Sequence, residues 1–318
     1  MKRIYICIYI ILLILSMLTG CGKPESNDKQ SIVCTTFPQY DWTKQILGDK
    51  LEQYNLTMLL DNQVDLHSYQ PTVNDIAKIY SCDLFIYVGG ESEGWVEEIL
   101  KEAVNNNMVV INLMEQLGDT VLEEEIKEGM QPENEPNEED NFDEHVWLSL
   151  RNAKLLSSAI ADSLSIIDKA NSEDYHKNLA GYLNLLSELD SRYLAVTDLA
   201  VQKTLLFGDR MPFSYLLNDY GIDYYAAFAG CSAETEVSFK TVIYLAEKMD
   251  ELGLETIIVT ESGTTDIART IISNTKQKNQ TIAVLNSMQS VTMQDVSNNV
   301  TYISIMTDNL TVLAEILK

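Results

Sequence analysis

The longest periodic stretch of the chain lies between residues 175 and 193 and predicts one long helix. Its apolar residues are spaced by four and three positions in turn: Tyr175, Leu179, Tyr182, Leu186, Leu189 and Tyr193. This spacing places all six on one face of an α-helix of at least about five turns. We expect this helix over residues 171–198. His176 lies beside the apolar stripe among charged residues, and we expect it at the surface.

Short apolar runs alternate with helical patterns on both sides of this helix. Before it, strands are expected at residues 31–37, 51–60, 83–88 and 108–113, and after it at 204–207, 223–228, 256–260 and 281–285. Such alternation predicts parallel sheets with helices on both faces. The chain is also too long for one typical core. The predicted fold class is therefore α/β: two lobes, each a mostly parallel sheet flanked by helices, joined by one long rigid helix. The first lobe is expected over residues 31–170 and the second over 199–318.

The first twenty residues have the pattern of a signal peptide. Lys2 and Arg3 precede an apolar run over 4–18, which is too short for a comfortable membrane span. The run ends in Leu18-Thr19-Gly20-Cys21, which resembles a bacterial lipobox with lipid on Cys21; an ordinary signal peptide or an uncleaved anchor is the alternative. Polar residues over 21–30 indicate a tether. We expect an extracytoplasmic protein, lipid-anchored to the bacterial cell membrane.

Acidic residues dominate the charge of the chain. The formal net charge is −26, and removal of residues 1–20, with Lys2 and Arg3, leaves −28. Such a charge argues against nucleic acid and anionic lipid as partners and raises the local cation concentration weakly. Residues 123–144 carry eleven acids and one lysine, together with Pro132 and Pro136. We interpret them as an acidic loop, either a solvated insertion or a weak cation-gathering arm.

The cysteines do not form a recognisable framework. Three remain after the signal peptide and lipobox, namely Cys34, Cys82 and Cys231. An odd, widely spaced set without a Cys-x-x-Cys pair is typical neither of a disulfide scaffold nor of a zinc cluster. Cys34 and Cys82 border apolar strand-like runs, so we expect buried thiols there.

Two loop histidines are the leading candidates for a binding site. His67 follows the apolar run 56–60 and His145 precedes a helical pattern. Ligands in open α/β sheets bind beyond the carboxyl ends of the strands. Asp209, Glu261 and Gln289 come after predicted strands of the second lobe. Imidazoles on one wall of a cleft and carboxylates on the other favour a divalent transition metal, with carboxylates moving the preference toward Mn²⁺.

Each of these residues also has an ordinary structural explanation. His67 could be a solvated loop histidine, Asp209 could form a salt bridge with Arg210, and Glu261 could cap a helix. The spacing of the candidates is by itself a weak signal, because the sequence contains no His-Glu-x-x-His motif.

A set of short motifs makes the metal hypothesis specific. They are residues 35–41 (TTFPQYD), 67–71 (HSYQP), 143–149 (DEHVWLS) with Asn152 and Ala153, 213–216 (FSYL) with Tyr220 and Gly221, 232–236 (SAETE), and 302–306 (YISIM) with Asn309 and Leu310. Together they make the chain resemble the metal-binding lipoproteins of the zinc/manganese branch of ABC-importer solute-binding proteins. The resemblance covers essentially the whole mature chain.

The resemblance implies a metal in the cleft between the lobes, with His67 and His145 as its first two ligands. The family's third ligand stands three residues before the Phe of the Phe-x-Tyr motif, which is Arg210 here and cannot ligate. Asp209 is the substitute that we expect. The fourth family position falls near Asn286 or Gln289, neither of them acidic, so Glu261 is expected to supply the carboxylate and Gln289 is a further candidate.

The function implied is capture of Zn²⁺ or Mn²⁺ by a monomer that is not an enzyme. The ion would pass to the membrane permease of an ABC importer, and the ATPase of that importer would be an indirect partner. Zinc-specific members often carry a histidine-rich loop before the second ligand, whereas residues 123–144 are acidic. Capture should weaken as pH falls through histidine titration. The alternatives are a metal-dependent hydrolase with Glu144 as its base, and a binding protein for a metal chelate such as a siderophore.

Overall fold

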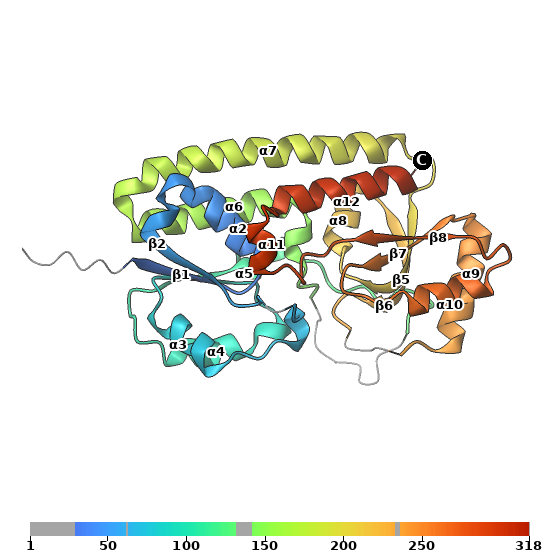
Figure 1. The fold of residues 1–318 in the computed structure, drawn as a ribbon, viewed down its shortest axis with the longest axis horizontal. Helices are drawn as coiled ribbons and strands as arrows, with labels where there is room; N and C mark the ends of the chain where they lie inside the picture. The colour runs from blue at the N-terminus through green and yellow to red at the C-terminus, as the bar shows by residue number, and fades with distance from the viewer. Residues whose placement is uncertain (1–28, 62, 132–141, 233–235, 318) are drawn as a thin grey trace, which may run out of the picture.

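The computed structural model contains two α/β lobes side by side, with one long helix running across both (Figure 1). It describes residues 29–61, 63–131, 142–232 and 236–317. The predicted signal peptide, Cys21 and most of the tether lie outside the described residues, as do residues 132–141 of the acidic loop. No helix in the described part is both long and apolar enough to cross a membrane. The predicted fold class is confirmed.

The first lobe is built on a parallel sheet with the strand order β2-β1-β3-β4. Its strands are β1 (Gln30–Cys34), β2 (Tyr54–Met58), β3 (Leu84–Tyr87) and β4 (Val109–Asn112). β1 and β3 lie in the middle of the sheet, and Ile32, Val33, Phe85 and Ile86 are fully buried there. Fully buried parallel strands of this kind carry continuous apolar runs, which is why the sequence reveals them.

Helices cover both faces of this sheet. They are α2 (Phe37–Leu47), α3 (Val73–Ser81), α4 (Trp95–Lys101), α5 (Leu113–Leu117) and α6 (Leu150–Ile167). α2 and α6 lie on the side of the long helix, and α3 and α4 lie on the opposite side (Figure 1). The predicted strand at residues 51–60 is wrong at its start. α2 ends at Leu47 and is capped by Gly48, with φ of 51°, and residues 48–53 form a 3₁₀ helix before β2 begins.

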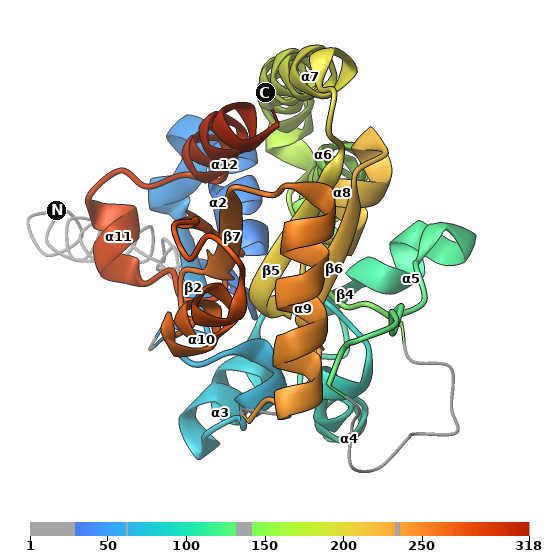
Figure 2. The same ribbon diagram turned by 90° about the vertical axis from the view of Figure 1, so that its right-hand side faces the viewer.

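The second lobe repeats the arrangement of the first, with the strand order β6-β5-β7-β8. Its strands are β5 (Thr204–Met211), β6 (Asp223–Ala229), β7 (Thr256–Thr260) and β8 (Thr281–Leu285). The helices after α7 are α8 (Ser214–Tyr220), α9 (Phe239–Leu252), α10 (Asp266–Asn274), α11 (Met293–Ser297) and α12 (Tyr302–Ile316), and α11 lies against the first lobe (Figure 1). α7 lies at the top in Figure 2, and α9 runs along the side of the sheet that faces the viewer.

The long helix α7 (Ser172–Leu199) has the predicted position and the predicted buried stripe. Near its start the Asn178 amide donates to the carbonyl of Ile46 in the first lobe, at 3.0 Å. Further along, the Tyr193 hydroxyl donates to the carbonyl of Met306 in α12, at 2.6 Å. α7 is therefore bonded to elements from both halves of the chain. His176 is exposed, as expected.

The last helix returns to the first lobe and limits movement between the halves. The backbone N–H of Tyr302 donates to Asp41 of α2 at 2.9 Å, and its hydroxyl donates to the Trp147 carbonyl at 2.7 Å. The Trp147 indole in turn donates to the Ser287 carbonyl at 2.9 Å. All four side chains are nearly or fully buried. These bonds lie beside the facing edges of the two lobes, where the candidate site is found.

Candidate metal centre

His67 is held in a short turn that follows β2. Residues 66–68 form a single 3₁₀ turn, in which the Asp65 carboxylate accepts the backbone N–H of His67 at 2.9 Å. Leu66 is buried and anchors the turn. The imidazole Nδ1 lies 2.8 Å from the Ser92 hydroxyl and 3.4 Å from a Glu144 carboxylate oxygen. The Glu144 carboxylate is closer to Nδ1 than the Asp65 carboxylate is to Nε2, at 3.9 Å, so these contacts favour the proton on Nδ1 and leave a lone pair on Nε2.

His145 is fully buried and is oriented by a carboxylate two residues earlier. Asp143 Oδ1 accepts the backbone N–H of His145 at 2.8 Å and lies 2.8 Å from its ring Nδ1. The carbonyl of Asp143 accepts the Tyr215 hydroxyl at 2.8 Å, which fixes this segment to α8. The carboxylate again favours the proton on Nδ1, so that Nε2 of His145 carries the lone pair.

The two histidines meet through these free nitrogens. Nε2 of His67 lies 3.3 Å from Nε2 of His145. The side-chain nitrogen of Gln289 lies 3.3 Å from Nε2 of His145, and its amide oxygen is buried without a hydrogen-bond partner among the described residues. Two imidazoles from the first lobe and one amide from the second therefore converge on one point.

Burial and neighbouring charge act differently on the two imidazoles. Burial, followed by the proximity of His145, lowers the pKa of His67 to about 4. Burial also opposes the charged form of His145, but the Asp143 carboxylate outweighs it and raises the His145 pKa. A cluster in which His67 stays neutral retains at least one unprotonated nitrogen donor at neutral pH.

The two acids chosen from the sequence have other partners. Asp209 lies inside β5 rather than after it, because the strand continues to Met211 through a register shift between Phe207 and Arg210. Its carboxylate accepts the hydroxyl of Thr260 at 2.6 Å. The Glu261 carboxylate accepts the backbone N–H and the hydroxyl of Ser287, at 2.7 and 3.0 Å. Neither acid belongs to the group of candidate ligand atoms around the histidines in the described residues.

Arg210 forms its ion pair with Asp65, at 3.6 Å. Among the described residues, Asp209 and Arg210 do not form the salt bridge that the sequence suggested as an alternative. Asp65 and Arg210 line a cavity of about 180 Å³ that also borders Asp209 and Gln289. Gln289, whose side-chain nitrogen lies 3.3 Å from Nε2 of His145, connects this cavity to the histidine pair.

Cys231 joins the histidines, although the sequence did not single it out as a ligand. Among the described residues, one group of candidate metal ligands is formed by His67, His145 and Cys231, whose ligand atoms lie within 4.8 Å of one another. Cys34 and Cys82 are buried and unpaired, as expected. Cys231 follows β6 after a single glycine, and this place at the carboxyl end of a strand was the available signal.

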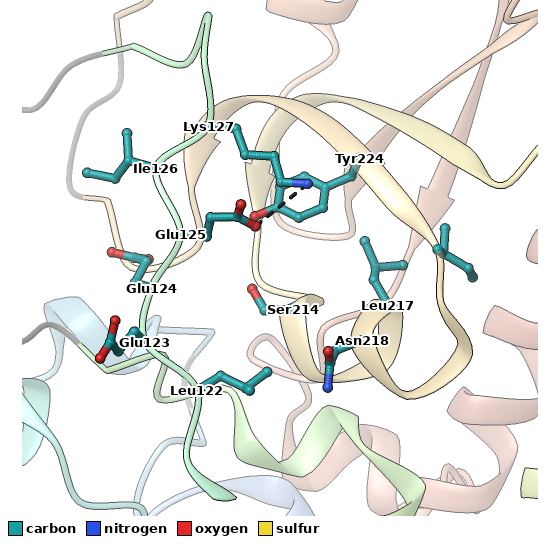
Figure 3. A pocket seen from close by; sticks show the side chains of 11 residues that line it. Leu122, Glu123, Glu124, Glu125, Ile126, Lys127, Ser214, Leu217, Asn218 and Tyr224 are labelled. Carbon is teal, nitrogen blue, oxygen red and sulfur yellow. Dashed lines mark ion pairs between the residues drawn. The ribbon is translucent and has the colours of Figure 1, made fainter.

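The described part of the acidic loop runs along the second lobe. Residues 122–127 line a cavity of about 580 Å³ together with Ser214, Asn218 and Tyr224 (Figure 3). Figure 3 shows the ion pair between Glu125 and Lys127, whose ammonium lies over the Tyr224 ring. Glu124 accepts the backbone N–H of Cys231 at 2.7 Å. This part of the loop thus supports the segment that carries the cysteine.

Comparison with known proteins places the chain in a family. The model of the family described as "Zinc-uptake complex component A periplasmic" matches residues 32–316. The zinc-binding lipoprotein AdcA of Streptococcus pneumoniae (strain ATCC BAA-255 / R6) is 32% identical over 303 residues, which are 94% of this chain and 58% of AdcA. The chain thus spans little more than half of that relative. The high-affinity zinc uptake system protein ZnuA of Bacillus subtilis (strain 168) is 27% identical over 97% of this chain and 96% of its own.

Solved structures with the same fold agree with this placement. The metal-dependent lipoprotein YcdH from Bacillus subtilis has a TM-score of 0.74 and 28% identity, and the match covers 91% of this chain and 99% of that one. The Zn(II)-bound ZnuA-like domain of Streptococcus pneumoniae AdcA has a TM-score of 0.72 and 30% identity, with the same coverage of both chains.

Proposed function

Because the chain belongs to the family of the zinc-uptake complex component A, we propose that it captures Zn²⁺ between its lobes and passes the ion to an ABC importer. The separation of 3.3 Å between the two histidine Nε2 atoms carries this proposal. Two zinc–nitrogen bonds of about 2.0–2.1 Å at a tetrahedral angle place the nitrogens about 3.3–3.4 Å apart. With the proton of each ring on Nδ1, two lone pairs face each other at this distance, and a cation between them removes their repulsion.

The donor atoms support zinc rather than manganese as cargo. Neither Asp209 nor Glu261 reaches the histidine group, so the carboxylate oxygens that Mn²⁺ prefers are not supplied by these residues. The relatives named above are described as zinc-binding or zinc-uptake proteins. We accordingly propose Zn²⁺ as the ion, with His67 and His145 as its first two ligands.

The proposal extends to where the protein works and with what. Cleavage before Cys21 and lipid on its thiol would hold a monomer at the outer face of the membrane, as the lipoprotein names of the relatives suggest. The partner would be the permease of an ABC importer, whose ATPase is reached only indirectly. The hydrogen bonds that join α7 and α12 to both lobes favour release by local loop motion rather than by wide hinge bending.

A hydrolase is less well supported by the geometry. The candidate base Glu144 is buried, and its carboxylate lies on the Nδ1 side of His67, accepting the Ser92 backbone N–H at 2.8 Å. A water bound to an ion between the two Nε2 atoms would sit on the opposite side of the ring. A general base must lie within hydrogen-bond reach of the proton that it removes.

A chelate-binding protein would need more room beside the histidines. The adjoining cavity measures about 180 Å³. Pockets for drug-sized ligands measure about 300–1,000 Å³, and siderophore complexes belong to that size class. The small cavity favours a bare ion.

Metal stoichiometry tests the proposal. The chain from residue 22 onward, loaded with Zn²⁺ and freed of excess ion, should hold one zinc per chain by elemental analysis. The double variant His67→Ala/His145→Ala should hold none, and His176→Ala, which removes the exposed histidine, should hold one. Equal zinc content in the double variant would refute the proposal.

A further inference from the structure

The thiol of Cys231 lies beside the histidine pair and has no role in the site described so far. Its sulfur is 3.9 Å from Nδ1 of His145, and one ligand atom each from Cys231, His67 and His145 lie within 4.8 Å of one another. A zinc–sulfur bond of about 2.3 Å and a zinc–nitrogen bond of about 2.0–2.1 Å at a tetrahedral angle separate sulfur and nitrogen by about 3.6 Å. Because the sulfur lies nearest to Nδ1, it has to move toward the Nε2 side of the ring to reach an ion bound there.

The backbone around Cys231 is built to bring it close to His145. The preceding residue is Gly230, where an added Cβ would lie 2.9 Å from the Met211 carbonyl and 3.4 Å from Cε1 of His145. The 2.9 Å approach to the Met211 carbonyl requires glycine here, whereas the approach to the imidazole is an ordinary van der Waals contact. The next peptide N–H, that of Cys231, is held by Glu124 at 2.7 Å. Both contacts fix the direction in which the cysteine leaves the strand.

The Gln289 amide is a further polar group beside the two histidines. Its amide oxygen is buried and accepts no hydrogen bond within the described residues, while its nitrogen lies 3.3 Å from Nε2 of His145. A half-turn of the amide exchanges the two atoms and directs the oxygen to where an ion would bind both Nε2 atoms. The four side chains then offer two nitrogens, one sulfur and one neutral oxygen.

Resting on the proposed function, we infer that Cys231 is the third protein ligand of the cargo ion and that Gln289 faces the fourth position. When the ion binds, the sulfur–metal bond forms, the sulfur–hydrogen bond breaks, and the proton leaves to water. A thiolate with two imidazoles selects borderline and soft ions such as Zn²⁺, Co²⁺ and Cd²⁺, and selects against Mn²⁺. The cargo class is therefore thiophilic divalent ions.

Cobalt provides a direct optical test, because a thiolate bound to Co²⁺ adds a ligand-to-metal charge-transfer band in the near ultraviolet. The unsubstituted chain should bind one Co²⁺ with this band. Cys231→Ser should lose the band while keeping the visible bands of cobalt bound by histidine. The matched control is Cys82→Ser, which changes a buried thiol that donates to the Ile79 carbonyl and should leave the band intact.

Competition measurements complete the test. In Cys231→Ser the affinity for Zn²⁺ should fall at least about tenfold, while that for Mn²⁺ changes by less than about twofold. Stoichiometric Co²⁺ binding without the charge-transfer band, or a band that survives in Cys231→Ser, would overturn the assignment of Cys231 and leave the proposed function standing. Failure of the unsubstituted chain to bind Co²⁺ and Zn²⁺ would overturn both.

Discussion

Asp143 offers the sharpest test of how this chain prepares a histidine for an ion. Its carboxylate is fully buried, and one oxygen accepts both the backbone N–H and the ring Nδ1–H of His145, each at 2.8 Å. Asparagine has the same shape but no charge. Its amide can also turn and donate to Nδ1, which moves the ring proton to Nε2 and blocks the lone pair. Asp143→Asn should therefore weaken Zn²⁺ binding without touching a ligand.

The expected loss of Zn²⁺ affinity in Asp143→Asn follows from the burial of Asp143 and His145. Loss of a carboxylate that orients a metal-binding histidine costs about 10–100-fold in affinity. His145 and Asp143 are both 0% exposed, so water does not screen their attraction, and we expect the upper half of that range. A loss of about 30–100-fold corresponds to about 2–3 kcal/mol of binding free energy.

A competition titration against a chromophoric zinc chelator at neutral pH measures this loss. Asp219→Asn is the matched control, because Asp219 is a largely buried carboxylate that accepts the Ser149 hydroxyl at 2.6 Å and does not contact the histidines. The control should bind Zn²⁺ within about twofold of the unsubstituted chain, and circular dichroism should report native folding for both variants. If Asp143→Asn also binds within twofold, the tautomer explanation is refuted.

Three further predictions concern the surroundings of the site and the frame that holds it. Ser92→Ala removes the hydroxyl at Nδ1 of His67 and should weaken zinc binding about tenfold or less in the same titration, since the Glu144 carboxylate remains; an unchanged affinity would contradict a role for Ser92. Burial raises the pKa of Glu93 to about 7, from about 4.5 in the unfolded chain. As far as Glu93 is concerned, the fold is therefore most stable below pH of about 4.5, where Glu93 is neutral in both states, and it loses stability as pH rises through about 7. Glu93→Gln, which is always neutral, should therefore raise stability relative to the unsubstituted chain by about 1–3 kcal/mol at about pH 8 and much less at about pH 4, as measured by urea unfolding; an equal effect at both pH values would refute this. Leu186→Ala in the buried stripe of α7 should cost about 2–5 kcal/mol of unfolding free energy, whereas the same change at exposed Leu185 should cost under about 1 kcal/mol.

The frame of the molecule could be predicted because its signals are local and periodic. The stripe from Tyr175 to Tyr193 repeats at helical spacing, and strands such as β8 are short apolar runs between turn residues. The short helices α5 and α11, by contrast, were not predicted. Each has five residues, too few to establish a period, and each begins at a polar cap, Asn112 or Thr292, that can equally start a turn.

Half of the candidate site could be predicted for a similar reason. His67 and His145 stand in loops next to recognisable strands and helices, and the structure brings their Nε2 atoms together. The contribution of the second lobe depends on details that spacing does not encode. The register shift in β5 keeps Asp209 within a strand and bonded to Thr260. The close approach of Gly230 to His145, which brings Cys231 near the histidines, depends on tertiary packing.

Crystals of the chain loaded with Zn²⁺, measured on both sides of the zinc absorption edge, test the central claim most directly. The claim is that one ion binds between the two imidazoles whose Nε2 atoms lie 3.3 Å apart. The predicted result is a single anomalous difference peak at about 2.0–2.1 Å from both atoms. A peak bound only by the acids of residues 123–128, or no peak between His67 and His145, would contradict it.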